Sequence, residues 1–365
     1  MDIRSLLMNR DQYLPSLDGL RGIAAFAVVL SHIGLLLGTD IPWLNIGDES
    51  VALFFALSGF LMAHLYGDKP FTFARVSDYL VHRFTRIYPV YLVAICFVIL
   101  LSMVPGLDYF QPITGAVQIL RHVAMLGSSG VFWSIPPEIQ FYLFFLLLWL
   151  CFEKPGQRQT LAVALLAAFT LGMVLDFPGP GILLLSKIPY FLFGAFAGRL
   201  FRSGLFLPSN AITGVAALGL LAVFFLGRNL FSSSTTFWGT QTALIAATIV
   251  YLSACEALPS KAILAAAPLR FAGKISFSLY LFHVPVSFLV TKALPAPVSP
   301  WLAAGAMIAA SLIAATASHY GIERPTRRWL LAAWNGRRAR HTEPVPADVP
   351  APAQRGPLDL SAVSA

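Results

Sequence analysis

Arg21 and His32 are the polar residues at the edge and in the middle of the first long apolar stretch, Ile23 to Leu37. In an α-helix, eleven residues differ from three full turns by only about 20°, so both side chains leave one face. The rise between them is about 16 Å, about half the roughly 30 Å hydrocarbon core of a bilayer. If Arg21 lies at the edge of that core, His32 lies near its middle, where an ionisable side chain is costly. The pair therefore indicates chemistry inside a membrane.

The composition is that of a polytopic membrane protein. Of 365 residues, 57% are hydrophobic and 12% are charged, with a mean hydropathy of +0.74, whereas about a quarter of the residues of a soluble domain are charged. The net charge of +8 does not indicate a nucleic-acid partner, because the basic residues are scattered between apolar stretches. The predicted partner is the lipid bilayer, with no nucleic acid, and the oligomeric state is left open.

Long apolar stretches and their flanking charges predict an all-α membrane protein of about ten transmembrane helices. With the N-terminus in the cytoplasm, 21 of the 25 Lys and Arg residues fall on the cytoplasmic side and 4 on the other. This is the asymmetry that the positive-inside rule expects, so both termini are predicted to be cytoplasmic. The predicted spans are 20–38, 48–66, 87–104, 138–152, 160–176, 181–200, 210–228, 236–254, 275–293 and 300–320.

The chain divides into a cytoplasmic N-terminus (1–19), one transmembrane domain (20–328) and a cytoplasmic tail (329–365). From about His341 the tail is rich in proline and poor in large apolar residues, so disorder is predicted there. The first span lacks a small-x-small cleavage pattern and is expected to be retained. The three cysteines lack metal-ligand spacing, so no metal site is expected.

Between the second and third spans, Arg83 and Arg86 lie three residues apart on a predicted short cytoplasmic helix. Two guanidinium groups on one helix face suit a phosphate group. The same arrangement is typical of a loop that is anchored to anionic lipid headgroups. The spacing alone leaves both interpretations open.

Another helix is predicted to begin at Pro136-Pro137 on the far side, with Glu138 in its first turn, where the helix dipole favours a negative charge. Tyr142 follows one turn later. This pair suits holding a sugar hydroxyl or orienting an imidazole. The alternative is a helix-terminal charge beside an interfacial aromatic belt.

Ser276, Tyr280 and His283 recur at i, i+4 and i+7 and form one polar stripe on the ninth predicted span. Such side chains also form structural hydrogen bonds between membrane helices, so the stripe alone does not assign a role. The sequence contains no Gly-x-Ser-x-Gly elbow, Walker loop, dinucleotide fingerprint or His-Glu-x-x-His motif. Hydrolase, ATPase, dehydrogenase and zinc-protease functions therefore lack their usual support.

Taken in order, these motifs resemble those of the membrane acyltransferase-3 family. The resemblance covers about residues 12–328, without the C-terminal hydrolase-like domain that some relatives carry. The matching segments are Ser16 to Ala25 with the Arg21–His32 spacing, Phe54 to Leu61 with Ser58, Arg83 to Pro89, Trp133-Ser134 with Glu138 and Tyr142, Ser276 to His283, and Glu323-Arg324-Pro325.

The resemblance implies a multi-pass enzyme of the bacterial cytoplasmic (inner) membrane. It would move an acyl group, usually acetyl, from cytoplasmic acyl-CoA to a hydroxyl of a saccharide, a glycolipid or another glycosylated acceptor. Acyl-CoA would be the donor substrate, with no bound cofactor. His32 would act as general base on the acceptor hydroxyl or carry the acyl group transiently.

Further roles follow from the same resemblance. Arg21, Arg83 and Arg86 would hold the CoA phosphates at the cytoplasmic face, with Asp18 paired to one of them. Glu138, as a catalytic residue, and Tyr142 would act on the acceptor side. The chain departs from the family at Ile139-Gln140, where relatives commonly have a second acid, so a different acceptor is possible. The remaining expected substrate-binding residues are Ser58, Trp133, Ser276, Tyr280 and His283.

Two other classes fit parts of the sequence. A transporter or flippase for a lipid-linked sugar or small amphiphile would also have about ten spans, polar groups at mid-membrane and a broken segment such as Pro136-Pro137. The other large family of membrane-bound O-acyltransferases has its key histidine late in the chain, where His283 lies. Loss of acyl transfer on replacing His32 would favour an acyltransferase-3 enzyme over both of these classes.

Overall fold

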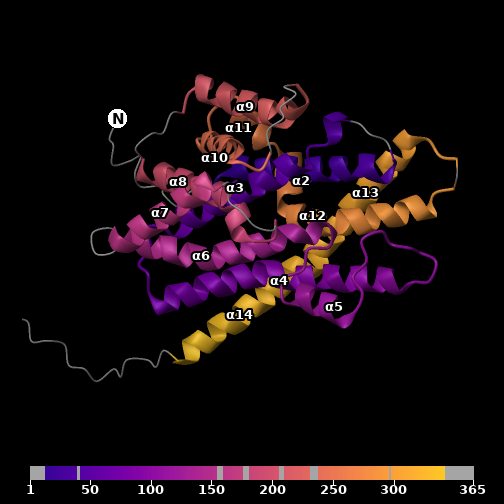
Figure 1. The fold of residues 1–365 in the computed structure, drawn as a ribbon, viewed down its shortest axis with the longest axis horizontal. Helices are drawn as coiled ribbons and strands as arrows, with labels where there is room; N and C mark the ends of the chain where they lie inside the picture. The colour runs from indigo at the N-terminus through magenta and orange to yellow at the C-terminus, as the bar shows by residue number, and fades with distance from the viewer. Residues whose placement is uncertain are drawn as a thin grey trace, which may run out of the picture.

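The computed structural model describes residues 13–38, 42–153, 159–175, 181–204, 209–230, 237–295 and 297–341. Throughout these ranges every regular element is helical (Figure 1). This confirms the prediction of an all-α protein. The predicted disorder of the tail beyond His341 lies outside the described residues.

Each of the ten predicted spans overlaps an α-helix of the structure. The short helices α5 (Ala116–Val123) and α11 (Ser260–Leu264) and a final helix, α14 (Arg324–His341), complete the α-helical elements of the described ranges. The ten helices are α2 (Pro15–Leu36), α3 (Gly47–Tyr66), α4 (Phe73–Met103), α6 (Ile135–Glu153), α7 (Gln159–Val174), α8 (Ile188–Ser203), α9 (Ala211–Leu230), α10 (Thr240–Ala254), α12 (Ala267–Ala293) and α13 (Pro300–Ser318).

Not all of these ten helices have the length and composition of a membrane span. Within the described part of the chain there are 6 such stretches, and three further apolar helices are shorter. The number of ten spans and the cytoplasmic location of the termini therefore stay predictions. The 6 stretches are Pro15–Leu36, Gly47–Tyr66, Phe73–Met103, Gly130–Phe152, Ala267–Ala293 and Pro300–Arg338.

Helix α4 corrects one prediction. Arg83 and Arg86 do not lie on a separate short helix, because α4 runs without a break through 31 residues with Pro89 inside it. At the α-helical rise this length is about 46 Å, more than the hydrocarbon core of a bilayer requires. The missing N–H of one proline is tolerated in such a helix where neighbouring groups satisfy the freed carbonyl. Both arginines are therefore fixed to a long, continuous helix.

Helices α2 and α3 lie side by side at the centre of the bundle, between α8 and α10 on one side and α4 and α6 on the other (Figure 1). The closest packing joins α2 to α12 and α3 to α8. At the first of these contacts, a Cβ at Gly22 would collide with the backbone carbonyl of Leu269, and one at Gly273 with that of Asp18. Glycine at these two positions lets the helix backbones touch, as small residues do between membrane helices.

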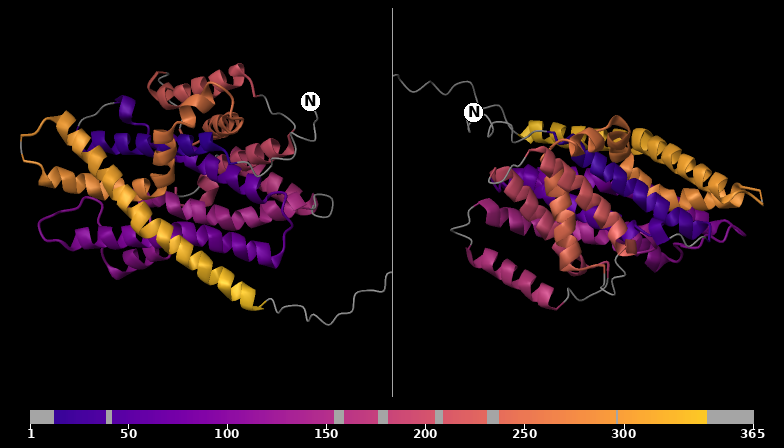
Figure 2. Two further views of the ribbon diagram at one scale, coloured as in Figure 1. Left: turned by 180° about the vertical axis from the view of Figure 1, so that it is seen from behind. Right: turned by 90° about the horizontal axis from the view of Figure 1, so that it is seen from above.

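Helix α14 crosses α4 obliquely, as the view from behind shows (Figure 2). Its Trp334 Nε1 donates to Asp78 Oδ1 over 2.8 Å, and Arg338 forms an ion pair with the same carboxylate. The first part of the predicted tail, up to His341, is therefore a helix that is held against α4.

Replacing Gly273 by alanine is expected to lower the free energy of unfolding by about 1–3 kcal/mol, because overpacking this contact forces α2 and α12 apart. Gly305→Ala is the matched control, since a Cβ there meets nothing within 4 Å. Thermal unfolding of both purified variants in one detergent measures the difference. Equal stability of the two variants would contradict the close contact.

Candidate functional site

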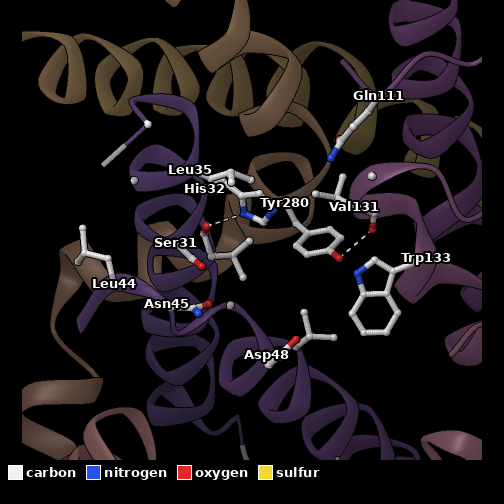
Figure 3. Close-up of a pocket in the computed structure, with 16 residues that line it drawn as sticks. Ser31, His32, Leu35, Leu44, Asn45, Asp48, Gln111, Val131, Trp133 and Tyr280 are labelled. Carbon is white, nitrogen blue, oxygen red and sulfur yellow. Dashed lines mark hydrogen bonds between the residues drawn. The ribbon is translucent and has the colours of Figure 1, made fainter. Parts of the chain in front are cut away.

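Two cavities adjoin along α2. We call the larger one, about 620 Å³, the histidine cavity, because His32 lies on its wall near the C-terminal end of α2 (Figure 3). The start of α3 contributes Asp48 to the same wall. Most of the other wall groups are neutral. The polar and aromatic side chains that line it are Ser31, His32, Asn45, Asp48, Gln111, Trp133 and Tyr280.

The second cavity, which we call the arginine cavity, lies towards the N-terminal end of α2 and measures about 50 Å³. Arg21, Arg86 and Glu138 bring charges to its wall. Val51 and Tyr280 line both cavities, so the two adjoin at these side chains. The other lining residues are Phe54, Phe55, Ser58, Ile87, Ser134, Ile135, Ser276 and Phe277.

The predicted single face of α2 thus leads from one cavity to the other. Arg21 lines the arginine cavity and His32 the histidine cavity. The eleven-residue separation corresponds to a rise of about 16 Å. The two side chains therefore lie at different levels of α2, each on the wall of its own cavity.

His32 is half-buried and makes contacts at one edge of its ring. Its Nδ1 lies 3.0 Å from the carbonyl oxygen of Val28 and 3.2 Å from Nε2 of His283. The two imidazole rings meet edge to face, with centroids 4.9 Å apart. The other ring nitrogen of His32 points away from α2, towards the side of the cavity that holds Tyr280 (Figure 3). That nitrogen is the atom available for chemistry.

Glu138 lies apart from His32, and its predicted role on the acceptor side stays a prediction. Glu138 lies with Arg21 and Arg86 in the arginine cavity. Its Oε1 accepts hydrogen bonds from Ser58 Oγ over 2.9 Å and from the Tyr142 hydroxyl over 2.6 Å. The carboxylate is thus held by two neutral donors and faces two cations, which compensates its removal from water.

A 3₁₀ helix, Gly130–Ser134, explains this placement. The chain passes from the histidine cavity, at Val131 and Trp133, to the arginine cavity, at Ser134 and Glu138, before α6 continues. The sequence indicated the proline helix start but not the preceding 3₁₀ turn.

Arg83 does not lie on the wall of the arginine cavity, although Arg86 does. The Arg83 guanidinium is surrounded by three tyrosine rings, with centroids 5.7 Å (Tyr66), 5.9 Å (Tyr79) and 5.8 Å (Tyr142) away. Cation–π attraction of this kind is stronger where water is excluded. Arg83 therefore supports the tyrosine that holds Glu138, and of the pair Arg83 and Arg86 it is Arg86 that lines the cavity.

Two of the three residues in the polar stripe of the ninth predicted span line the cavities. Ser276 lines the arginine cavity, and Tyr280 lies where the two cavities adjoin. The Tyr280 hydroxyl donates to the Val131 carbonyl over 2.8 Å and accepts from Ser134 Oγ over 2.9 Å. His283 is 1% exposed and contacts His32 rather than a cavity. Asp18 was expected to pair with an arginine, and in the structure its carboxylate accepts a hydrogen bond from the Tyr13 hydroxyl.

The wall of the histidine cavity also includes Asp48, Asn45 and Gln111, which were not predicted from the sequence. Asp48 had a weak signal, because it is one of two acids in the first turn of α3, where a capping role is the common reading. Asn45 and Gln111 come from connecting segments and had none. Trp133 was predicted, and the cationic Nζ of Lys187, 5.7 Å from its ring centroid, helps to fix it.

The acyltransferase-3 family model, described as an acyltransferase domain, matches residues 14–320. The chain belongs to this family. Resemblance of the motifs to acyltransferase-3 proteins is thereby confirmed, and the site described above lies wholly within the matched residues.

Among curated proteins, this acyltransferase-3 chain is similar to two bacterial O-acetyltransferases. It is 25% identical to O-acetyltransferase OatA of Staphylococcus aureus, over 78% of this chain and 52% of that protein. It is 27% identical to peptidoglycan O-acetyltransferase OatA of Listeria monocytogenes, over 87% of this chain and 56% of that protein. The chain thus spans about half the length of these relatives. No solved structure matches.

Tyr142→Phe is expected to lower the free energy of unfolding by about 1.5–3 kcal/mol, the range for a hydrogen bond to a charged group. The lost bond is the 2.6 Å contact to Glu138. Tyr88→Phe is the control on α4, where the ring is half-buried and stacks on Phe84. Thermal unfolding in detergent compares them, and an equal loss in both would argue against a structural bond at Glu138.

Proposed function

We propose that this protein is an O-acetyltransferase of the bacterial cytoplasmic membrane that moves an acetyl group from acetyl-CoA to a hydroxyl of a saccharide acceptor. The observation that carries the proposal is the position of His32 on the wall of a large polar cavity, on the same helix face as an arginine in a second, adjoining cavity. The O-acetyltransferase names of the two OatA relatives support the acyl group and the acceptor class.

The donor end of the proposed path is the arginine cavity. Arg21 and Arg86 suit the phosphates of CoA, because guanidinium groups bind phosphate oxygens in pairs. The thioester arm then extends about 16 Å along α2 to reach His32. A volume of about 50 Å³ does not hold such an arm. Donor binding therefore requires the phenylalanine side chains of this cavity, Phe54, Phe55 and Phe277, to move aside.

In the proposed reaction, His32 takes the proton of the acceptor hydroxyl while the hydroxyl oxygen attacks the thioester carbonyl carbon. The tetrahedral intermediate collapses with cleavage of the carbon–sulfur bond, and the leaving thiolate takes the proton from the His32 ring. The products are the acetyl ester and CoA thiol. In a variant of this route, the His32 ring nitrogen attacks the thioester carbonyl first, which breaks the carbon–sulfur bond and releases the CoA thiolate. The acceptor hydroxyl then attacks the acetyl group on the ring, the bond to the ring nitrogen breaks, and the hydroxyl proton passes to the thiolate. Both routes use the ring nitrogen that faces the cavity.

The acceptor is proposed to be a saccharide unit. Among aliphatic and glycine residues, the wall of the histidine cavity carries the polar side chains of Ser31, Asn45 and Gln111, the ring of Trp133 and the carboxylate of Asp48. Specific sugar sites commonly combine an aromatic ring with a few placed polar groups, as sites for small molecules do.

Replacing His32 by alanine is expected to lower acetyl transfer by about 10²- to 10⁴-fold, the contribution of a positioned general base. The measurement is release of CoA thiol and transfer of labelled acetyl to a panel of glycan and glycolipid acceptors. His82→Ala, a half-buried histidine outside both cavities, is the control. Equal activity of wild type and His32→Ala would refute the role of His32. Movement of an acceptor without release of CoA thiol would favour the transporter class.

Arg86→Ala is expected to raise the KM for acetyl-CoA by about 10- to 100-fold, the equivalent of one charge-assisted hydrogen bond. The KM for S-acetyl-N-acetylcysteamine, a thioester without phosphates, is expected to stay within about two-fold, since the lost bond is to phosphate. Arg199→Ala is the control, because Arg199 pairs with Asp68 away from both cavities. An equal rise of the two KM values would show that Arg86 does not bind phosphate.

A further inference from the structure

The hydrogen positions on His283 follow from its neighbours. Its Nδ1 lies 2.8 Å from the carbonyl oxygen of Tyr280 and 3.1 Å from that of Leu279. A carbonyl oxygen accepts hydrogen bonds and cannot donate them, so the ring hydrogen is on Nδ1. In a neutral imidazole, Nε2 then carries a lone pair. His283 therefore presents an acceptor to whatever faces its Nε2.

The group that faces it is Nδ1 of His32, 3.2 Å away. The same Nδ1 also lies 3.0 Å from the carbonyl oxygen of Val28. Both neighbours of this atom are acceptors, so the hydrogen of the His32 ring is on Nδ1. The lone pair of His32 is then on Nε2, the nitrogen that points into the histidine cavity (Figure 3).

We infer that His283 is a positioning residue that holds His32 in the tautomer with Nε2 ready to accept a proton. The inference rests on the proposed function, because the lone pair is useful only if His32 acts on an acceptor hydroxyl or a thioester. When Nε2 takes a proton, the positive charge spreads to the Nδ1–H group, and its hydrogen bond to His283 becomes stronger. A buried second histidine thus takes the place that a carboxylate holds behind the histidine of a catalytic triad.

Packing supports this assignment. The two histidines are 251 residues apart in the chain, and they meet because α2 and α12 lie in backbone contact at Gly22 and Gly273. His283 itself is 1% exposed and lines neither cavity. It can therefore act on the reaction only through His32, which excludes the role of a residue that binds the acceptor directly.

The carbonyl of Val28 limits how much activity the loss of His283 should cost. This carbonyl, one helical turn before His32, also favours the hydrogen on Nδ1, so loss of His283 removes one of two acceptors. We expect kcat to fall by about 10- to 100-fold in His283→Leu, part of the contribution of a general base. The KM values for acetyl-CoA and for the acceptor should change by less than about two-fold, because His283 touches neither substrate.

The conservative variant separates positioning from packing. In His283→Gln the side-chain amide oxygen can accept the hydrogen bond from His32 Nδ1, whereas leucine fills similar volume without an acceptor. We expect the glutamine variant to keep most of the wild-type kcat at a thermal stability equal to that of the leucine variant. Equal loss of kcat in the two variants would overturn the inference, as would wild-type kcat in His283→Leu.

A second measurement does not depend on activity. Nitrogen NMR of the full chain with ¹⁵N-labelled histidine distinguishes a protonated from an unprotonated ring nitrogen, and His32→Gln identifies the His32 signals by their loss. We expect the hydrogen of His32 on Nδ1 in the wild type and a mixture of tautomers in His283→Leu. A hydrogen on Nε2 in the wild type would overturn the inference even if acetyl transfer is observed. The expected tautomer without acetyl transfer would instead refute the proposed function.

Discussion

The backbone contact between α2 and α12 is the constraint on which the site depends. Glycine at positions 22 and 273 removes the side chains that would separate the two helices. Without this approach His283 would not reach His32, and Tyr280 would not lie where the two cavities adjoin. The two glycines thus determine how the polar side chains of α2 and α12 are placed in the site. Because a packed interface cannot deform smoothly, even one added methyl group should be felt at the histidine pair.

Charge in the site is compensated locally. The arginine cavity contains two guanidinium groups and one carboxylate, and that carboxylate also accepts from two hydroxyl groups. Arg83, one helical turn away, is surrounded by tyrosine rings instead of an acid. Isolated charges in a bundle of apolar helices would be costly, and both Glu138 and Arg83 are stabilised by contacts with neutral side chains. The two arginines of the cavity retain excess positive charge, which favours an anionic ligand there.

The sequence predicted the helices and the side chains that share one helix face, because both depend on local periodicity. Apolar stretches of sufficient length, the single face of Arg21 and His32, and the stripe at Ser276, Tyr280 and His283 all follow from 3.6 residues per turn. The cavity of Glu138, the separation of Arg83 from Arg86 and the contribution of Asp48 could not be predicted in this way. They depend on a short 3₁₀ turn and on which neighbouring helix each side chain meets, and neither leaves a periodic pattern.

The junction between the cavities also has a physical consequence for a membrane protein. A wide aqueous path from the arginines to His32 would let ions cross between the two ends of the bundle. Here the two cavities adjoin at Val51 and Tyr280, and the arginine cavity measures about 50 Å³. Phe54, Phe55 and Phe277 line this small cavity, so it leaves room for few water molecules. On the proposed function, the acyl arm of the donor would fill the junction between the two cavities during transfer. The arm would then block the passage of ions in place of the phenylalanine rings. A narrow resting cavity and a long donor arm are therefore compatible with each other.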